Sequence, residues 1–296
     1  MSCLDEIKTM TLKLLKKIFS NSLNEYYSKE EINTLFHILI EFYLGINKIN
    51  YIQDPLYIIS KKNISLIESK IKMIQKKIPI QYIIGEVEHK NIKFKLNKYV
   101  LIPRPETIEL CDWIIFNQKN KCKILDIGTG SGLIALILKK YITGSIVHAW
   151  DKSPLILKIA KENALKNNIE INFKIVDILK NVKVNDKFDL IVSNPPYVDK
   201  SEMQFIDESI VKYEPHSAIF VEGNDNLIFY KKIIQYSKDA LNSDGVLYLE
   251  CHTDRINFVK NILKINNFKN IKIKEDLFGR KRMIKACLLY TSPSPR

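Results

Sequence analysis

This chain of 296 residues has few cysteines, no membrane-length apolar run and no signal-like beginning. Its five cysteines are scattered, without the spacing of a metal site or a disulfide framework, so we expect neither. No uninterrupted apolar stretch is long enough to suggest a membrane span. The first residues, Met-Ser-Cys-Leu-Asp-Glu, lack the pattern of a signal peptide. These absences predict a cytoplasmic protein with no metal and no membrane association.

The chain is strongly basic. Its formal net charge is +13 at pH 7 and its isoelectric point is near 9.3, a balance that is common in proteins that bind nucleic acid. Lysine far outnumbers arginine, however, and the lysines are spread along the predicted helices instead of being gathered in one arm. We therefore discount the charge as a sign of nucleic-acid binding, and at most expect it to steer encounters with a partner. The hydrophobic content of 46% is enough for a packed core.

The first part of the chain has a helical pattern. Ser28 and Glu31 form a predicted capping box in front of an apolar stripe with helical spacing. Strand character appears only later, over residues 87–100. We expect a small helical domain over residues 1–78 and a linker with hairpin character over residues 79–104.

From about residue 105 onward, strand and helix patterns alternate. This alternation predicts a doubly wound α/β domain over residues 105–286. Residues 287–296 resemble a translated sequencing adapter, so we expect them to be a non-native tail. The alternative is a genuine short disordered tail.

The four residues that follow an apolar predicted strand at 188–193 suit one planar amino group. Asn194 offers a carboxamide oxygen, and the carbonyl of Pro195 is followed by a second proline, so no adjacent N–H competes for it. These two acceptors can take both hydrogens of an amide or an exocyclic amine, and Tyr197 supplies a ring face for a flat group. The same four residue types are also common in ordinary turns. The predicted catalytic residues are Asn194, Pro195, Pro196 and Tyr197.

A second motif lies upstream, where an apolar strand at 124–127 runs into a turn rich in glycine. Glycine lets a backbone approach a ligand closely, and the helix that follows offers free N–H groups. The turn lacks the G-x-x-G continuation of a dinucleotide fingerprint, which disfavours NAD. The residues of this predicted cofactor turn are Asp126, Gly128, Thr129, Gly130, Ser131 and Gly132.

Two later predicted strands also end in an acid. Asp151 follows the strand at 145–150 and suits the two hydroxyls of a ribose. Asp177 follows the strand at 171–176 and is placed to accept a hydrogen bond from an adenine amino group. Each acid alone is an ordinary cap or turn residue, but three acidic strand ends in register with one glycine turn favour a nucleoside-containing cofactor.

Taken together, these motifs resemble the class I S-adenosylmethionine-dependent methyltransferases that act on planar nitrogens, and among them the HemK/PrmC protein-(glutamine-N5) methyltransferases. The resemblance covers residues 79–286. An Arg-Pro-Glu-Thr loop combined with Asn-Pro-Pro-Tyr is specific, whereas either motif alone is not. The other segments that match are 79–85, 101–107, 213–215, Gly223, Asp225, Leu227, 276–280 and Arg282.

The resemblance implies a Rossmann-like mixed seven-stranded sheet, preceded by a small helical domain that docks the substrate. It implies S-adenosyl-L-methionine as the cofactor, in contact also with Ile178 and Asn194. Ile178 stands where some members have an aromatic side chain, and an aliphatic one can still cover a purine. The implied reaction methylates the glutamine of the Gly-Gly-Gln motif in class I peptide chain release factors. The implied substrate-binding residues are Arg104, Glu106, Thr107, Asn194, Pro195, Pro196 and Tyr197.

Other functions remain open at this point. The same motif serves enzymes that methylate a ribosomal-protein glutamine or an exocyclic amine of a nucleic acid, although the residues after Tyr197 leave little room for a target-recognition domain. A binding module without catalysis is disfavoured because the motifs are intact. We expect no metal, since His148, His216 and His252 lack ligand spacing. We expect a monomer, with at most a weak association with the ribosome or RNA.

Overall fold

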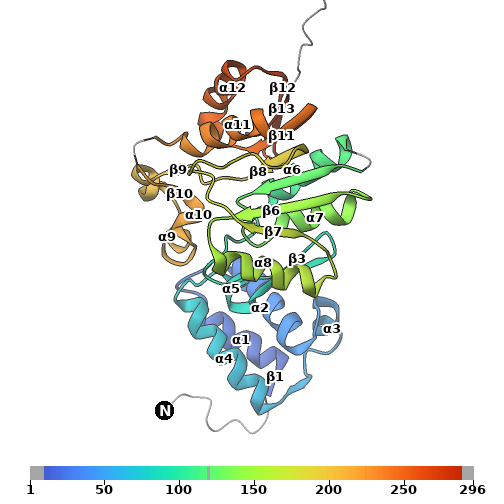
Figure 1. Cartoon of the computed structure of the whole chain (residues 1–296). Coiled ribbons are helices and arrows are strands. Elements are labelled where there is room, and N and C mark those ends of the chain that lie inside the picture. The colour runs from blue at the N-terminus through green and yellow to red at the C-terminus, as the bar shows by residue number, and fades with distance from the viewer. Residues whose placement is uncertain (1–9, 119–120, 224, 289–296) are drawn as a thin grey trace, which may run out of the picture. The chain divides into compact units, whose positions relative to one another are not determined.

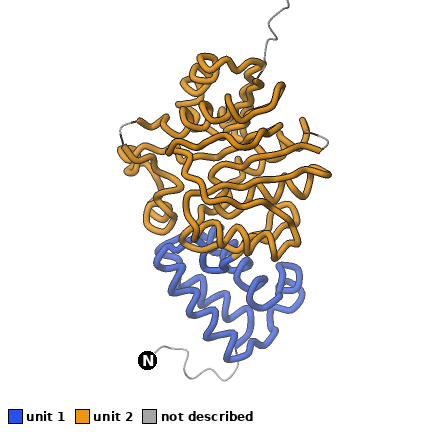
Figure 2. The backbone as a smooth tube through the Cα atoms, viewed as in Figure 1, with its two compact units in different colours: residues 1–85 blue, residues 86–296 orange. Residues whose placement is uncertain are grey.

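The computed structural model describes residues 10–118, 121–223 and 225–288. The chain divides into two compact units, residues 1–85 and residues 86–296 (Figure 2). Each unit has its own hydrophobic core.

The first unit is mainly helical. A short antiparallel pair, β1 (Met10–Thr11) with β2 (Ile58–Ile59), lies beside its helices. Its core contains Phe19 and Phe36, whose rings meet edge to face with centroids 5.5 Å apart. The helices are α1 (Leu12–Leu23), α2 (Lys29–Leu44), α3 (Lys48–Gln53), α4 (Lys61–Gln75) and α5 (Ile80–Ile84).

The capping box predicted at the start of α2 is confirmed. The backbone N–H of Glu31 donates to Ser28 Oγ at 3.3 Å, and the Ser28 N–H donates to Glu31 Oε2 at 2.8 Å. Two of the N–H groups that a helix start leaves without an intrahelical partner are satisfied in this way. At the other end, Gly45 adopts a left-handed conformation with φ of 70° and terminates the helix.

The second unit is built on a mixed seven-stranded sheet, as predicted (Figure 1). The strand order is β12-β13-β11-β8-β5-β6-β7, and β13 runs antiparallel to both of its neighbours while the other pairs are parallel. The strands are β5 (Lys123–Ile127), β6 (Ile146–Asp151), β7 (Asn172–Ile175), β8 (Phe188–Ser193), β11 (Leu241–Glu250), β12 (Phe268–Glu275) and β13 (Lys281–Leu288).

Helices cover both faces of this sheet, because its central strands are apolar on both sides. One core joins the strands to α6 (Pro105–Asn117) and α7 (Leu133–Tyr141). The other joins them to α11 (Ile228–Ala240) and α12 (Ile256–Ile265). A further helix, α8 (Pro154–Lys166), connects β6 to β7. Burial on both faces explains why these strands read as continuous apolar runs and not as alternating patterns.

The order of the strands creates a switch point between β5 and β8. The chain builds β5, β6 and β7 outward in one direction and then returns to place β8 on the other side of β5. Loops that leave the carboxyl ends of β5 and β8 therefore diverge, and a crevice opens between them. Ile127 and Ser193, the last residues of these two strands, are paired in register.

Between β8 and β11 the chain makes a small excursion over this edge. It contains β9 (Val198–Asp199), the 3-10 helix η1 (Lys200–Phe205), α9 (Glu208–Tyr213), α10 (His216–Ile219) and β10 (Phe220–Val221). The two short strands β9 and β10 pair in parallel, which returns the chain to the sheet. The excursion brings Ser217 and Ala218 to the same cavity that the glycine turn lines.

The expected linker at 79–104 contains a well-formed hairpin. Its strands are β3 (Glu86–His89) and β4 (Ile92–Lys95), and they are joined by Lys90 and Asn91, both with positive φ. Ile92 and Phe94 are fully buried in the core that α6 and α7 also share. The hairpin thus packs as part of the second unit, which begins at Glu86.

Asn163 of α8 and Asn167, the residue that caps this helix, complete the exposed edge of β4. Asn163 accepts the Lys95 N–H at 2.7 Å and donates to the Lys95 carbonyl, and Asn167 makes the same pair of bonds to Lys93. Four helical residues rise about 6 Å and two strand residues about 6.6 Å, so the two carboxamides match alternate residues of the strand. Asn163 also donates to the Ser131 carbonyl, which ties the hairpin to the glycine turn.

The expected boundary at residue 286 falls inside β13. Cys287 pairs with Val246 on one side and with Lys269 on the other, so the last strand continues beyond Ala286. The other residues of the expected tail, 289–296, lie outside the described part of the chain. Among the helices that the structure describes, none is long and apolar enough to cross a bilayer.

The contacts of Asn163 lead to a prediction about stability. Replacing Asn163 by alanine removes three hydrogen bonds, one to the buried Ser131 carbonyl and two to the part-buried backbone of Lys95. Each backbone group that loses its partner costs about 1–3 kcal/mol, so we expect the unfolding free energy to fall by about 3 kcal/mol in urea titrations. Asn167→Ala is the matched control and should cost less, because Asn167 is only half-buried. Equal losses in the two variants would contradict the account.

Candidate active site

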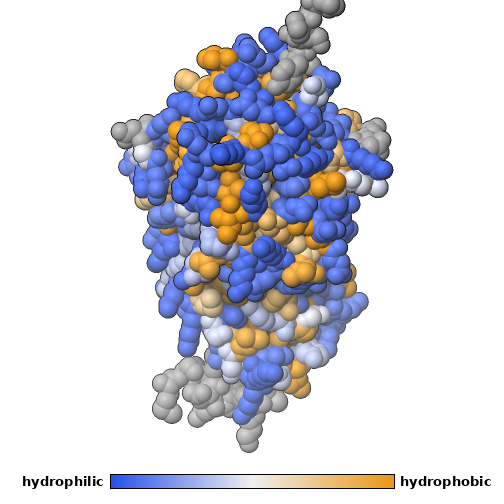
Figure 3. All heavy atoms as spheres, in the orientation of Figure 1, coloured by the Kyte–Doolittle hydropathy of each residue, from blue (hydrophilic) through white to orange (hydrophobic). Residues whose placement is uncertain are grey.

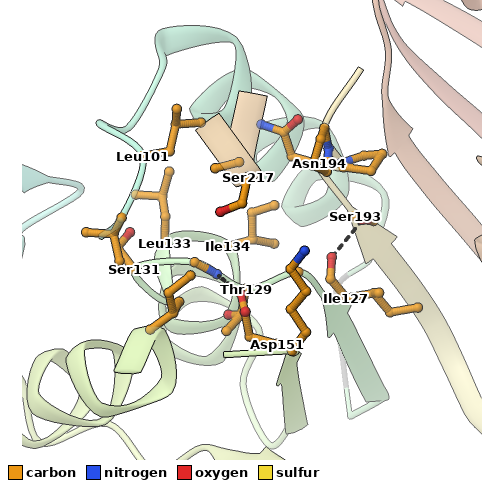
Figure 4. Close-up of a pocket in the computed structure, with 18 of the residues that line it drawn as sticks. Leu101, Ile127, Thr129, Ser131, Leu133, Ile134, Asp151, Ser193, Asn194 and Ser217 are labelled. Atoms are coloured by element: carbon orange, nitrogen blue, oxygen red, sulfur yellow. Dashed lines mark hydrogen bonds between the residues drawn. The ribbon is translucent and has the colours of Figure 1, made fainter. Parts of the chain in front are cut away.

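Most of the predicted site residues meet at a cavity on the carboxyl edge of the sheet (Figure 4). Together with its mouth, this cavity contains about 1040 Å³ of empty space. Its walls come from the turn after β5, the ends of β6 and β7, the turn after β8, residues 99–104 with Thr107, and residues 217–218 of the excursion. All of these walls belong to the second unit.

The glycine turn forms the floor of the cavity. Gly128 and Gly130 have φ of 76° and 57°, a conformation that side chains with a Cβ rarely adopt. The N–H groups of Gly128 and Thr129 both donate to the Trp150 carbonyl, at 2.8 and 2.9 Å, which anchors the turn to β6. A Cβ at either of these glycines would meet no other protein atom within 4 Å. The turn therefore presents a bare backbone surface to the cavity.

Asp126 lies behind the turn and not in the cavity wall. It is fully buried, and its Oδ2 accepts a hydrogen bond from Thr129 Oγ1 at 2.6 Å. Burial raises the pKa of Asp126 to about 7. The structure thus gives Asp126 the role of holding the turn that faces the ligand. Gly132 also lies outside the wall, where a Cβ would come within 2.8 Å of Leu136.

Asp151 ends β6 at the cavity wall. Its Oδ2 accepts the Gly130 N–H at 3.2 Å and its Oδ1 accepts the Ser153 N–H at 3.1 Å. Burial raises the pKa of Asp151, and the two backbone N–H groups oppose that shift by stabilising the carboxylate. Each oxygen keeps a further lone pair, so the carboxylate can still accept from a pair of ligand hydroxyls.

The third acid, Asp177, lines the same cavity beside an apolar surface. Its Oδ1 accepts the Leu179 N–H at 3.1 Å, which fixes the direction of the side chain. Ile178 is buried next to it, and Phe229 and Ile233 of α11 complete the apolar patch. A flat heterocycle could be covered by these side chains and recognised at its edge by Asp177.

Asn194 lies on the opposite side of the cavity from the glycine turn, directly after β8 (Figure 4). Its Nδ2 donates to Thr107 Oγ1 at 3.0 Å. Pro195 and Pro196 line the cavity beside it. Ser193 Oγ donates to the Ile127 carbonyl at 2.6 Å, drawn as a dashed line in Figure 4, and this bond joins the two strands where their loops separate.

The position of Tyr197 differs from the expectation that its ring faces the substrate. Tyr197 lies outside the described cavity wall and packs on the core to which α11 and α12 contribute. Its ring is tilted by 50° against His252, with centroids 5.8 Å apart, and its carbonyl accepts from Arg255 at 2.8 Å. Burial raises the pKa of its hydroxyl. In this structure Tyr197 anchors the turn that carries Asn194.

The loop at 101–104 is held by one buried acid, Glu214. Glu214 Oε1 pairs with Arg104 Nη2 at 2.5 Å, and its Oε2 accepts the Ile102 N–H at 3.2 Å. Arg104 and Thr107 line the cavity, whereas Glu106, the third residue expected to bind substrate, does not. Within the Arg-Pro-Glu-Thr segment, the first and last residues therefore line the cavity, and Thr107 does so from the first turn of α6.

Sequence reasoning missed several residues that the structure brings to the site. Ser217, Lys152 and Phe229 line the cavity without belonging to a recognisable motif. Glu250 is fully buried at the end of β11 and accepts a hydrogen bond from Thr107 Oγ1 at 2.7 Å. One signal was available for Glu250, because it is a charged residue at the end of an otherwise apolar strand.

Comparison with protein families supports a methyltransferase. Residues 114–217 match the family described as "Methyltransferase small domain". The chain is 38% identical over 283 residues to the release factor glutamine methyltransferase of Flavobacterium psychrophilum, covering 93% of this chain and 99% of that protein. The protein of the same name from Bacteroides thetaiotaomicron is 33% identical, with 90% and 96% covered. That from Lactococcus lactis is 39% identical, with 81% and 88% covered.

Solved structures share the fold. A methyltransferase from Pyrococcus furiosus is similar with a TM-score of 0.53 at 18% identity, covering 78% of this chain and all of that one. A 16S rRNA N2 G1207 methyltransferase from Thermus thermophilus, solved with AdoMet and guanosine, has a TM-score of 0.50 at 14% identity, covering 68% and 49%. These likenesses concern the sheet and its helices, whereas the sequence relatives match nearly the whole chain. The chain belongs to the release factor glutamine methyltransferase family.

Proposed function

We propose that this protein transfers a methyl group from S-adenosylmethionine to the side-chain amide nitrogen of the glutamine in the Gly-Gly-Gln motif of peptide chain release factors. The observation that carries the proposal is the position of Asn194 and Pro195 on the wall of the cavity that the glycine turn also lines. The names of the sequence relatives point to the same substrate.

The residues of the cavity fit S-adenosylmethionine. The bare backbone at Gly128 and Gly130 leaves room for a ligand in close contact. Asp151 offers a carboxylate for the ribose hydroxyls, and Asp177 with the apolar patch around Ile178 suits the adenine. When bound, this cofactor supplies a methyl group on a positively charged sulfur, which is a good leaving group.

The substrate amide is a poor nucleophile, because its nitrogen lone pair is delocalised into the carbonyl. The protein therefore has to align and stabilise more than it has to abstract a proton. Asn194 Oδ1 and the Pro195 carbonyl are the two acceptors available for the two N–H hydrogens of the amide. Holding both hydrogens fixes the plane of the amide and directs the face of its nitrogen into the cavity.

The same two acceptors stabilise the charge that develops. As the nitrogen forms its bond to the methyl carbon it becomes positive, and its N–H groups become stronger donors. Hydrogen bonds to Asn194 and Pro195 then gain more in the transition state than in the ground state, which is the condition for catalysis. The proton leaves the nitrogen after transfer, so no strong base is needed beside it.

The basic character of the chain suits encounters with an acidic partner. Hydrophilic side chains cover most of the face shown in Figure 3 and are not gathered in one region. With a formal net charge of +13, the protein attracts acidic surfaces over a distance of about one Debye length. We propose that this attraction assists binding of a release factor by a monomeric enzyme, with any contact to ribosomal RNA being weak.

A methyl-transfer assay tests the proposed function. The protein is offered a release factor, a glutamine-containing ribosomal protein, DNA and RNA side by side with methyl-labelled cofactor. We expect label in the release factor alone. The matched control is the same release factor with its Gly-Gly-Gln glutamine changed to alanine, which should take up none. Equal labelling of that control, or labelling of DNA or RNA in its place, would overturn the proposal.

Asp151 provides a prediction about cofactor binding. Asp151→Ala removes the two acceptor oxygens assigned to the ribose. Losing charge-assisted hydrogen bonds of this kind costs about 1.5–3 kcal/mol, or roughly 10- to 150-fold in affinity by titration calorimetry. Asp151→Asn keeps one acceptor oxygen and should lose less. A folded Asp151→Ala protein with undiminished cofactor affinity would refute the assignment.

Asn194 provides a prediction that separates catalysis from binding. In Asn194→Ala the acceptor for the substrate N–H is absent, so we expect kcat to fall by on the order of 100-fold or more. Cofactor affinity should change little, because other residues hold most of the cofactor. Steady-state kinetics together with calorimetry on the same preparation measure both quantities.

Asn194→Asp and Tyr197→Phe are the control variants. Asn194→Asp keeps an acceptor oxygen and the shape but loses the donor to Thr107, so partial activity is expected. Tyr197→Phe keeps the ring that packs on His252 and should be milder than Tyr197→Ala. If cofactor affinity fell in parallel with kcat in Asn194→Ala, the division of roles between the two sides of the cavity would be wrong.

A further inference from the structure

Three side chains from distant parts of the chain form a continuous hydrogen-bonded row at the cavity. Thr107 Oγ1 donates to Glu250 Oε2 at 2.7 Å, and Asn194 Nδ2 donates to Thr107 Oγ1 at 3.0 Å. They come from the first turn of α6, the end of β11 and the residue after β8. Glu250 and Thr107 are buried, so the row leads inward from the cavity, with Asn194 at its open end.

The direction of each donor in this row follows from Glu250. An ionised carboxylate can only accept, so the single hydroxyl hydrogen of Thr107 must go to Glu250. The lone pairs of Thr107 Oγ1 then remain for Asn194, and a lone pair can only take an N–H. This leaves Nδ2 on the protein side and Oδ1 free to accept from a substrate in the cavity.

We propose that Glu250, acting through Thr107, sets the orientation of the Asn194 carboxamide so that its oxygen faces the substrate amide. The inference rests on the proposed function and extends it. Glu250 and Thr107 are positioning residues, since neither of them needs to touch the reacting atoms. Asn194 alone cannot select this orientation, because its oxygen and its nitrogen have nearly the same size and shape.

The groups around Glu250 place its ionisation near neutral pH. Burial raises the pKa of Glu250 to about 7, and the negative charge of Glu106 adds to the shift. The hydrogen bond from Thr107 and the positive charges of Arg282 and Arg104 oppose it. The Tyr230 hydroxyl donates to the Glu250 backbone carbonyl at 3.2 Å and does not reach the carboxylate.

When Glu250 is protonated, the hydroxyl hydrogen of Thr107 no longer has to point at its carboxyl group. A neutral carboxyl group can donate to Thr107, whose hydroxyl hydrogen is then free to point at Asn194. That hydrogen is accepted by Oδ1, so the carboxamide turns over and presents Nδ2 to the cavity. An N–H donor facing the N–H groups of the substrate would repel them, and the rate would fall.

The first test is a pair of variants at Thr107. Thr107→Val keeps the shape of the side chain and removes its hydroxyl, so the Asn194 amide loses the hydrogen bond that orients it. We expect kcat to fall by roughly 10- to 100-fold, the scale of a misplaced catalytic group, with cofactor affinity unchanged. Thr107→Ser restores the hydroxyl and should recover most of the rate. A Thr107→Val enzyme with the kcat of the unmodified protein would overturn the proposal.

The second test is the pH profile of kcat at saturating cofactor and substrate. In the unmodified protein the rate should fall as pH drops through about 7, where Glu250 becomes protonated. Glu250→Gln has the same shape but cannot ionise, so its rate should be lower at high pH and the step should disappear. Asp126 also has a pKa near 7, and its protonation should appear in cofactor affinity instead. An unchanged step in Glu250→Gln would contradict the proposal.

A third measurement does not depend on the substrate. The side-chain amide signals of Asn194 can be followed by nuclear magnetic resonance in the protein without substrate. They should shift as pH passes through about 7 in the unmodified protein and stay constant in Glu250→Gln and in Thr107→Val. A shift that persists in both variants would refute the inference. If the shift behaves as expected but the release factor takes up no methyl group, the proposed function is wrong, whereas the inference that Glu250 and Thr107 orient Asn194 is supported.

Discussion

Ile127 and Ser193 lie side by side at the ends of β5 and β8, and the Ser193 hydroxyl donates to the Ile127 carbonyl at 2.6 Å. One residue beyond each of them the chain leaves the sheet, as the glycine turn on one side and as Asn194 on the other. The pairing of two central strands thus fixes the separation between the cofactor surface and the substrate acceptors. Because both strands are buried in the core, the ends from which the two loops start are held in place by packing.

Buried acids then fix the loops that the sheet does not reach. Asp126 holds Thr129, Glu214 holds Arg104 and the backbone of Ile102, and Glu250 holds Thr107. Carboxylates can perform this work because each accepts several hydrogen bonds, but taking them out of water is costly. The folded protein binds a proton on Glu250 more tightly than the unfolded chain does, so this group costs stability as pH rises through about 7. The buried carboxylates therefore hold the loops of the site in place but lower the free energy of unfolding.

The parts of the site that follow a strand directly could be predicted from the sequence. The glycine turn, Asp151, Asp177 and Asn194 each come after an apolar run, and parallel strands bring such positions to one edge. Pairings across the sequence could not be predicted in this way, because Thr107 and Glu250 are 143 residues apart. The sequence also gave no indication that Tyr197 would turn toward the core, since its ring suits either a ligand or a packing role.

In the fold, too, local sequence patterns predicted the elements, whereas contacts between residues distant in the sequence could not be predicted. The alternation of strands and helices predicted a doubly wound α/β domain, the family resemblance implied the mixed sheet, and Ser28 with Glu31 predicted the start of α2. The hairpin at β3 and β4 was expected as a connection, because its strands are too short to show what they pack against. Only the contacts of Asn163 and Asn167 reveal that α8 completes its edge. Such contacts depend on tertiary structure and leave no periodic pattern.

The most direct test of this account is a crystal structure of the protein with the demethylated cofactor and a peptide that contains the Gly-Gly-Gln motif. The account predicts the glutamine Nε2 at about 2.7–3.2 Å from both Asn194 Oδ1 and the Pro195 carbonyl, a normal hydrogen-bond distance. Asn194 Nδ2 should remain on Thr107. A glutamine bound away from these two acceptors, or held through its carbonyl by Asn194 Nδ2, would contradict the account.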